Sequence, residues 1–565
     1  PNFKSKIGAK KWLPHGIQCW VNKLDWEKII KSQILWVIIG FTIGLSVIWW
    51  PMLNGNSLFN ALFIYIVASI QYAMAARGFV GWVAFLAIIL VGMAAITGRN
   101  LRSEKAGQIY KLFTSFVIGW GLSRAIIYFL LNYAFFRGSI AILPFMFGAV
   151  LLAGVAGNLT INASKLKGEI TPTVVIQKIP ILTVLLVSLV LTLPNLVDVA
   201  GLNASPPERP SDGYGSADMP YEVQEFYLTP DYPDNMTSWW DDWANEQEWN
   251  VHVFVPVGLT SESVGVAVVL HGYEGEKVEY YRDTMMSLAG QGLVTIFPQY
   301  VSDMDLSSIP TDFELNYTLG GSDHPQHLPR YTMALYGVDA GLEFINSDPS
   351  VRAVLGATEL NTNHMWIGGH SMGVGTTFYV LSELLSRGFG SQSLVVDLEA
   401  PWIHATQEGL MGNMSQLPDH TLIHVVEYET DIVVEKCIGR WQHARLTARD
   451  QSQPLASNQV LFLQVPSDFH GFPRLMASHY LPSGFVRDSL ADHSYYPRLE
   501  AQADFVASSA VGDVASADAA KSWFMNEGEM TDLGSWSDGV AVTPMTIVSS
   551  PLELTDDNLD ACPLP

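Results

Sequence analysis

A serine between two glycines is the first residue whose surroundings suggest chemistry. The motif Gly-His-Ser-Met-Gly at 369–373 follows an apolar run at 365–367 and precedes a helical pattern over 373–385. A serine at a strained strand-to-helix turn needs glycine on both sides, because larger side chains would meet the neighbouring backbone. Such a turn presents the hydroxyl at the carboxyl end of a strand, beside a helix N-terminus that favours negative charge. We therefore expect Ser371 to act as a nucleophile.

A serine nucleophile needs an imidazole base and a carboxylate that orients the base, and two later apolar runs are followed by such groups. Asp431 follows the run at 422–426, and His470 follows the run at 460–465. We expect Asp431 to be the acid and His470 to be the base. One other acid and two other histidines stay open as alternatives: Glu429, His479 and His493.

The oxyanion that forms on an attacked carbonyl group needs hydrogen-bond donors. An apolar run at 264–270 ends in a loop with glycines at 272 and 275. We expect the backbone N–H groups of Tyr273, in this loop, and of Met372, after the nucleophile, to hold the oxyanion.

These residues follow apolar runs that alternate with helical patterns in the second part of the chain. We expect strands at 251–257, 264–270, 293–297, 365–367, 394–398, 422–426 and 460–465, with helices notably at 331–345 and 373–385. Alternation of this kind predicts a mostly parallel sheet that helices cover on both faces.

Taken together, the motifs from about 220 to 550 resemble those of the α/β-hydrolases, most closely the cutinase-like polyester hydrolases and the dienelactone-hydrolase-like group. The matching segments are Gly-Tyr at 272–273, Gly-His-Ser-Met-Gly at 369–373, Ala-Pro-Trp at 400–402, Asp-Ile-Val-Val at 431–434 and Phe-His-Gly-Phe-Pro at 469–473. The resemblance implies a doubly wound sheet with the nucleophile, acid and base in that chain order.

The resemblance also implies roles for two aromatic residues. Tyr273 would supply an oxyanion N–H and stack on the acyl part of the substrate, and Trp402 would wall the same cleft. The chain departs from the family at His271, where proline is usual, at Val374, where polyester hydrolases tend to have glycine, and in a long insert at 301–329. The identity of the substrate therefore stays open.

The first part of the chain has a different character. The 565 residues are 49% hydrophobic, with a mean hydropathy of +0.20, and crossing a bilayer as a helix takes roughly 20 apolar residues. Apolar runs of about this length lie at 33–53, 57–76, 79–97, 110–136, 139–160 and 179–199. We expect four parts: a basic segment at 1–32, a transmembrane domain of about six helices at 33–199, a linker at 200–220 and an α/β-hydrolase domain at 221–565.

Net charge and cysteine content bear on which partners the protein binds and in which compartment it lies. A formal net charge of −24 disfavours nucleic acid as a partner, because phosphate binding needs a cationic surface. Cys437 and Cys562 would form a disulfide if their part of the chain faces an oxidising compartment. Basic residues near the apolar runs give contradictory orientations, and the cysteine pair favours a hydrolase domain outside the cytoplasm.

These features together predict an integral membrane protein whose hydrolase domain cleaves carboxylic esters through an acyl-enzyme. The expected partners are an ester or lipid substrate and the lipid bilayer, with no cofactor, no metal and no nucleic acid. A lipase or acyltransferase acting on membrane lipid remains an alternative, as does a catalytically idle hydrolase fold that serves as a receptor or scaffold.

Overall fold

The computed structural model describes residues 33–53, single positions between 112 and 127, and most of the chain from 204 to 554. Within this last part the described ranges are 204–302, 328–403, 414–448, 454–483 and 487–554, without positions 239, 432, 472 and 473. The chain divides into two compact units, Pro1–Asn203 and Ala204–Pro565.

In the first unit, the apolar run at 33–53 forms two short helices, α3 (Gln33–Gly44) and α4 (Ser46–Leu53). They contain 12 and 8 residues, whereas a helix that crosses a bilayer needs roughly 20. Among the residues described, no helix combines the length and the apolar character that a membrane span requires. This finding contradicts the transmembrane part of the predicted fold class and the predicted integral-membrane localisation. The other predicted runs fall wholly or largely outside the described residues.

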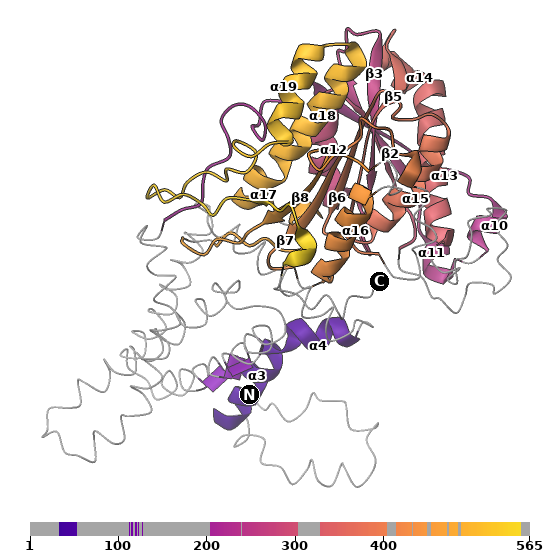
Figure 1. Ribbon diagram of the computed structural model, residues 1–565. Coiled ribbons are helices and arrows are strands. Elements are labelled where there is room, and N and C mark those ends of the chain that lie inside the picture. The colour runs from indigo at the N-terminus through magenta and orange to yellow at the C-terminus, as the bar shows by residue number, and fades with distance from the viewer. Residues whose placement is uncertain are drawn as a thin grey trace, which may run out of the picture. The chain divides into compact units, whose positions relative to one another are not determined.

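The second unit is built on a mixed sheet of nine strands in the order β1-β2-β4-β3-β5-β6-β7-β8-β9 (Figure 1). The six strands from β4 to β8 in this order are parallel, and the flanking strands β1, β2 and β9 pair antiparallel. The strands are β1 (Glu222–Leu228), β2 (Val251–Val257), β3 (Ser263–Leu270), β4 (Val294–Pro298), β5 (Glu359–His370), β6 (Ser393–Glu399), β7 (Leu422–Tyr428), β8 (Val460–Val465) and β9 (Thr546–Ile547).

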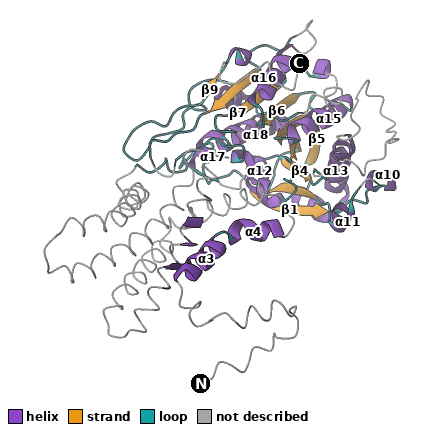
Figure 2. Cartoon of the chain, turned by 90° about the horizontal axis from the view of Figure 1, so that it is seen from below, coloured by secondary structure: helices purple, strands orange, loops and turns teal. Residues whose placement is uncertain are grey.

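Helices cover both faces of this sheet (Figures 1 and 2). Successive residues of β3 point to opposite faces, so that Val266 and Val268 join one buried apolar cluster while Ala267 and Val269 join the other. One face carries α13 (Leu328–Ser347), α14 (Pro349–Leu355), α15 (Gly373–Ser386) and α16 (Lys436–Ala448). The other carries α12 (Val278–Gly290), α17 (Ser489–Ser494), α18 (Tyr496–Val511) and α19 (Val514–Phe524).

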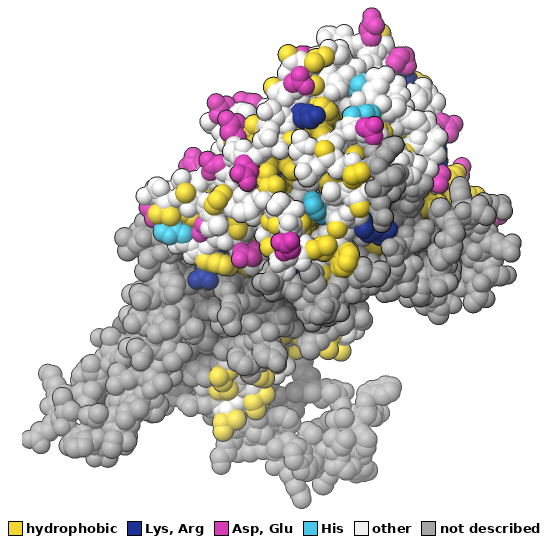
Figure 3. All heavy atoms as spheres, viewed as in Figure 1, with side chains coloured by type: hydrophobic (Ala, Val, Ile, Leu, Met, Phe, Trp, Pro, Cys, Tyr) yellow, Lys and Arg dark blue, Asp and Glu magenta, His cyan; other side chains and the backbone are white. Residues whose placement is uncertain are grey.

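Short helical elements occupy several connections between the strands. They are α10 (Asp234–Thr237), α11 (Asp242–Glu246) and the 3-10 turns η5 (Met414–Gln416), η6 (Leu481–Ser483) and η7 (Pro551–Glu553). On the face shown in Figure 3, acidic side chains are scattered over the described surface and basic ones are few, in line with the net charge of −24.

The segment expected to be a linker belongs to the second unit from residue 204 onward and contains no helix or strand up to residue 220. Helix α18 holds it through two carboxylates. The Tyr214 hydroxyl donates to Asp504 over 2.5 Å, and the Gly215 N–H donates to Glu500 over 2.6 Å. The segment is therefore packed on the sheet-bearing body.

One predicted covalent link receives partial support. Cys437 is buried in α16 and is disulfide-bonded. The other two cysteines of the chain, Cys19 and Cys562, both lie outside the described residues, so the structure does not identify the partner of Cys437. Pairing of Cys437 with Cys562 therefore stays a prediction.

Candidate active site

Ser371 lies in the sharp turn between β5 and α15, as the motif predicts. Its φ angle is +57°, in the left-handed region that a residue with a side chain rarely adopts. Two backbone hydrogen bonds hold this strained conformation: the Ser371 N–H donates to the Glu399 carbonyl over 2.8 Å, and the Ser371 carbonyl accepts from the Trp402 N–H over 3.1 Å. Strain of this kind is often retained at functional sites, where the surrounding structure maintains it.

Both glycines of the motif are needed for the turn to pack. A Cβ atom at Gly369 would lie 2.4 Å from Thr377 Oγ1, and one at Gly373 would lie 2.3 Å from the Leu270 carbonyl oxygen. Neither distance is compatible with a side chain. The turn is therefore pressed against the end of β3 and against its own helix.

A buried acid–base pair lies beyond the end of β7. His479 Nδ1 donates to Asp431 Oδ2 over 2.7 Å, and both side chains are at least 95% buried. The other carboxylate oxygen accepts from the N–H groups of Val433 and Val434 over 2.8 and 3.2 Å. Because Nδ1 carries the proton in this bond, the Nε2 atom of a neutral His479 is left as a proton acceptor.

The structure does not bring the predicted base, His470, to Asp431. The His470 Nε2 atom bonds to Asp538 over 2.7 Å, and 38% of the His470 side chain is exposed. The physical reason is a local hairpin after β8, in which Asp468 and Leu475 pair antiparallel. The hairpin places His470 at the surface, and the segment that follows the hairpin places His479 beside Asp431.

The two remaining alternatives lie elsewhere. Glu429 accepts from the Ser467 N–H over 2.7 Å, and His493 Nε2 donates to the Glu208 carbonyl over 2.8 Å. Of the histidines considered from the sequence, the one paired with Asp431 is thus His479. Sequence spacing pointed to the histidine nearest the strand end and did not reveal the intervening hairpin.

His479 also lies beside the nucleophile turn. Its backbone carbonyl accepts a hydrogen bond from His370 Nε2 over 2.7 Å, and the two imidazole centroids are 4.7 Å apart. His370 directly precedes Ser371. The serine turn and the acid–base pair therefore meet at this edge of the sheet.

The loop after β3 approaches the same serine. A Cβ atom at Gly272 would lie 3.1 Å from the Ser371 Cβ, so the following residue, Tyr273, is close to the turn. The Tyr273 side chain is about half exposed. Within the described residues the Met372 N–H has no hydrogen-bond acceptor, and a donor of this kind suits a developing oxyanion.

Buried neutral rings stabilise the approaching loop. His271 stacks on Tyr300 at 3.8 Å between centroids, donates from Nδ1 to the Gly272 carbonyl over 2.8 Å and accepts at Nε2 from the Tyr300 N–H over 3.2 Å. Burial lowers the pKa of the His271 imidazole to about 3. The ring is therefore uncharged near neutral pH and serves as a fixed bridge within the loop.

A buried ionic cluster supports the strand behind the nucleophile. The Glu399 side chain accepts from Arg498 over 2.6 Å and from the Tyr428 hydroxyl over 2.5 Å, and its backbone carbonyl holds the Ser371 N–H. Burial, together with the neighbouring Glu399 carboxylate, raises the pKa of Asp397 well above its ordinary value. Arg498 also lies 3.4 Å from Asp397 Oδ1, so a single guanidinium faces both carboxyl groups in this core.

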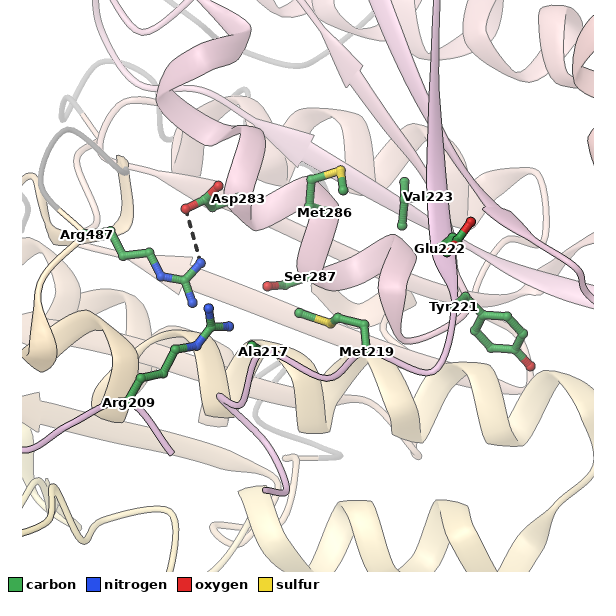
Figure 4. Close-up of a pocket in the computed structure, with 10 residues that line it drawn as sticks. All are labelled: Arg209, Ala217, Met219, Tyr221, Glu222, Val223, Asp283, Met286, Ser287 and Arg487. Carbon is green, nitrogen blue, oxygen red and sulfur yellow. Dashed lines mark hydrogen bonds and ion pairs between the residues drawn. The ribbon is translucent and has the colours of Figure 1, made fainter. Parts of the chain in front are cut away.

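A separate cavity of about 480 Å³ lies between the packed segment before β1 and helix α12 (Figure 4). Two of the residues that line the cavity, Arg487 and Asp283, form an ion pair over 3.1 Å. The cavity is lined by Arg209, Ala217, Met219, Tyr221, Glu222, Val223, Asp283, Met286, Ser287 and Arg487. None of the residues expected to take part in catalysis borders it.

Among the described residues, no cluster of three or more His, Cys, Asp or Glu side chains could bind a metal ion.

No protein-family model matches the chain, and no curated protein is significantly similar to it in sequence. Among solved structures, the chain is similar to a thermostable esterase from Pseudomonas putida, with 12% identity over 51% of this chain and 84% of that one and a TM-score of 0.30. Two esterase variants match at 13% and 12% identity, over 55% and 51% of this chain and 82% and 83% of theirs, with TM-scores of 0.27 and 0.30. Similarity this low identifies no activity, so function must be argued from the geometry of the site.

Proposed function

We propose that the second unit is a serine hydrolase that cleaves carboxylic esters, with Ser371 as nucleophile, His479 as base and Asp431 as the acid that orients it. One observation carries this proposal: the buried bond of 2.7 Å between His479 Nδ1 and Asp431 Oδ2, beside a serine held at a φ angle of +57°. This combination supplies a base that can accept a proton at Nε2, a fixed tautomer and a strained nucleophile turn.

The reaction would follow the usual two-step course of an acyl-enzyme. His479 Nε2 takes the proton of the Ser371 hydroxyl as the oxygen attacks the ester carbonyl. The N–H groups of Met372 and Tyr273 stabilise the resulting oxyanion. His479 returns the proton to the departing alcohol, and a water molecule, activated by the same imidazole, then releases the acid and restores the serine.

Two aromatic residues are proposed to border the substrate. Trp402 is tied to the nucleophile by its N–H bond to the Ser371 carbonyl, and Tyr273 adjoins Gly272 at the same turn. Their rings offer apolar surface for the acyl part of an ester.

The proposal is tested with a fluorophosphonate probe, which forms a covalent bond to an activated serine, followed by mass spectrometry of the labelled peptide. The wild-type chain should be labelled at Ser371, and His479→Gln should abolish labelling because the serine loses its base. The matched variant His470→Gln should label at the wild-type rate. Labelling at another serine would overturn the assignment of the nucleophile, and loss of labelling in His470→Gln alone would restore the base predicted from the sequence.

A further inference from the structure

His370, the residue before the nucleophile, makes two hydrogen bonds through its buried ring. Its Nδ1 atom lies 2.8 Å from the Tyr281 hydroxyl, and its Nε2 atom lies 2.7 Å from the backbone carbonyl of His479. These contacts come from three separate parts of the fold: the end of β5, helix α12 and the loop after β8.

The partners fix the tautomer of the ring. A carbonyl oxygen can only accept, so His370 Nε2 must carry the proton and donate it to His479. In a neutral ring Nδ1 is then an acceptor, and the Tyr281 hydroxyl must donate to it. The Tyr281 oxygen in turn accepts from the Gly272 N–H over 3.1 Å. Burial, together with the nearby His479, holds the pKa of the His370 imidazole well below its ordinary value, so the neutral form is the relevant one.

There is little space for the ring to move. The cavity that borders His370 and Tyr281 measures about 10 Å³, which is at the lower limit of the volume that one water molecule needs. A rotated His370 ring would therefore lose both partners without gaining solvent in their place. Each unpaired buried group would then carry a desolvation cost.

The residue held by His370 lies in an irregular segment. His479 precedes the turn η6 (Leu481–Ser483) and lies outside every strand and long helix. Before it, the Ala477 carbonyl accepts from the Thr430 N–H over 3.0 Å. The His479 side chain is fixed by Asp431 at Nδ1, and its backbone is fixed by His370. Two independent anchors thus define where His479 Nε2 lies relative to Ser371.

We propose that His370 is a positioning residue that holds the backbone of the base His479, through a bond chain running from Gly272 through Tyr281 to His370. This inference rests on the proposed function. It adds to that function a physical link between the oxyanion loop, the nucleophile turn and the base. The histidine of the Gly-His-Ser-Met-Gly motif then acts through His479 and does not touch the substrate.

The test compares His370→Leu with His370→Gln in the full chain. Leucine has a similar volume but removes both hydrogen bonds, whereas glutamine offers one acceptor for Tyr281 and one donor for the His479 carbonyl. With a p-nitrophenyl ester, His370→Leu should lower kcat on the order of 10²-fold, because a displacement of the base by about 1 Å has an effect of this size. KM should stay close to the wild-type value, and His370→Gln should recover most of kcat.

A matched control is available in α16. His443 is also buried, and its Nε2 atom donates to the Val460 carbonyl over 3.1 Å. His443→Leu removes a comparable bond away from the serine turn and should leave kcat unchanged. If His370→Leu does not fold by circular dichroism, Tyr281→Phe decides the question. It leaves His370 Nδ1 without its donor and should lower kcat by about tenfold, as expected for a less well oriented base.

The outcomes separate this inference from the proposed function. Fluorophosphonate labelling that needs neither Ser371 nor His479 would refute the proposed function itself. Labelling that needs both residues, together with wild-type kcat in folded His370→Leu or in Tyr281→Phe, would refute the positioning role alone. Equal loss in His370→Leu and His370→Gln would also refute it, because the two hydrogen bonds would not be the cause.

Discussion

His479 reaches Asp431 across 2.7 Å although 48 residues separate them in the chain. Asp431 follows β7, and His479 comes after β8 and after the hairpin that pairs Asp468 with Leu475. Because β7 and β8 are parallel neighbours, the segments that follow them begin at the same edge of the sheet. The acid and the base therefore come together because the strands that precede them are neighbours in the sheet. The hairpin determines which histidine pairs with Asp431.

Replacement of Asp431 by asparagine should reduce kcat on the order of 10⁴-fold with a p-nitrophenyl ester. The asparagine amide favours the wrong imidazole tautomer, so His479 Nε2 would no longer be free to accept the serine proton. The matched control is Glu429→Gln, two residues away, whose carboxylate bonds to the Ser467 N–H and not to a histidine. A severe loss in the Glu429 variant, with Asp431→Asn near wild type, would show that the acid has been misassigned.

Replacement of Gly373 by alanine should destabilise the protein and lower its esterase activity. The new Cβ would lie 2.3 Å from the Leu270 carbonyl oxygen and 2.6 Å from that of His271, so the turn and the oxyanion loop must move apart. Overpacking of this kind costs about 1–3 kcal/mol. The measurement is the free energy of unfolding in urea, combined with kcat.

Gly439 provides the control for this substitution. A Cβ there would meet Pro401 Cδ at 3.5 Å, an ordinary contact distance. Because Gly439 lies in α16, alanine should leave stability unchanged or raise it by up to about 1 kcal/mol. Similar stability of the Gly373 and Gly439 variants would contradict the packing argument.

Glu500 should make stability depend on pH. Its carboxylate accepts from the Gly215 N–H and the Ser287 hydroxyl, and burial raises its pKa from 4.5 to about 7. Between these two values the folded protein holds a proton that the unfolded chain releases. The free energy of unfolding therefore falls as pH rises through this window, by at most about 1.4 kcal/mol per pH unit from this group.

Glu500→Gln removes this titration while keeping an acceptor for the Gly215 N–H. Relative to wild type, the variant should gain stability as pH rises from 4.5 to 7, and the difference should level off at higher pH. Urea unfolding at several pH values measures the difference and cancels the contribution of other groups. A Glu500→Gln curve parallel to that of wild type would contradict the pKa shift.

Much of the sheet could be predicted from the sequence because its central strands are continuous apolar runs. The predicted runs at 251–257 and 460–465 coincide with β2 and β8. The edge strand β1 was missed because Glu222 and Glu225 interrupt its apolar pattern, and half-exposed edge strands carry a weak signal. In the candidate site, the structure gives Ser371 the predicted turn, whereas the pairing of Asp431 depends on a tertiary excursion that periodicity does not encode.

In the first unit, by contrast, the prediction from the sequence failed. Its apolar runs predicted membrane spans by length and composition alone, yet the run at 33–53 appears as helices of 12 and 8 residues. Hydropathy reports how apolar a segment is and does not report where its helix ends. The spans predicted from composition were therefore wrong for the residues that the structure describes.

The packing of residues 204–219 against α18 changes where a shortened chain should begin. A chain starting at residue 221 would leave the Glu500 carboxylate without the Gly215 N–H and would leave Asp504 without the Tyr214 hydroxyl. Ser489 would also lose the Pro207 carbonyl, which accepts from its hydroxyl over 2.7 Å. The smallest part of the second unit that retains these contacts therefore starts near Ala204.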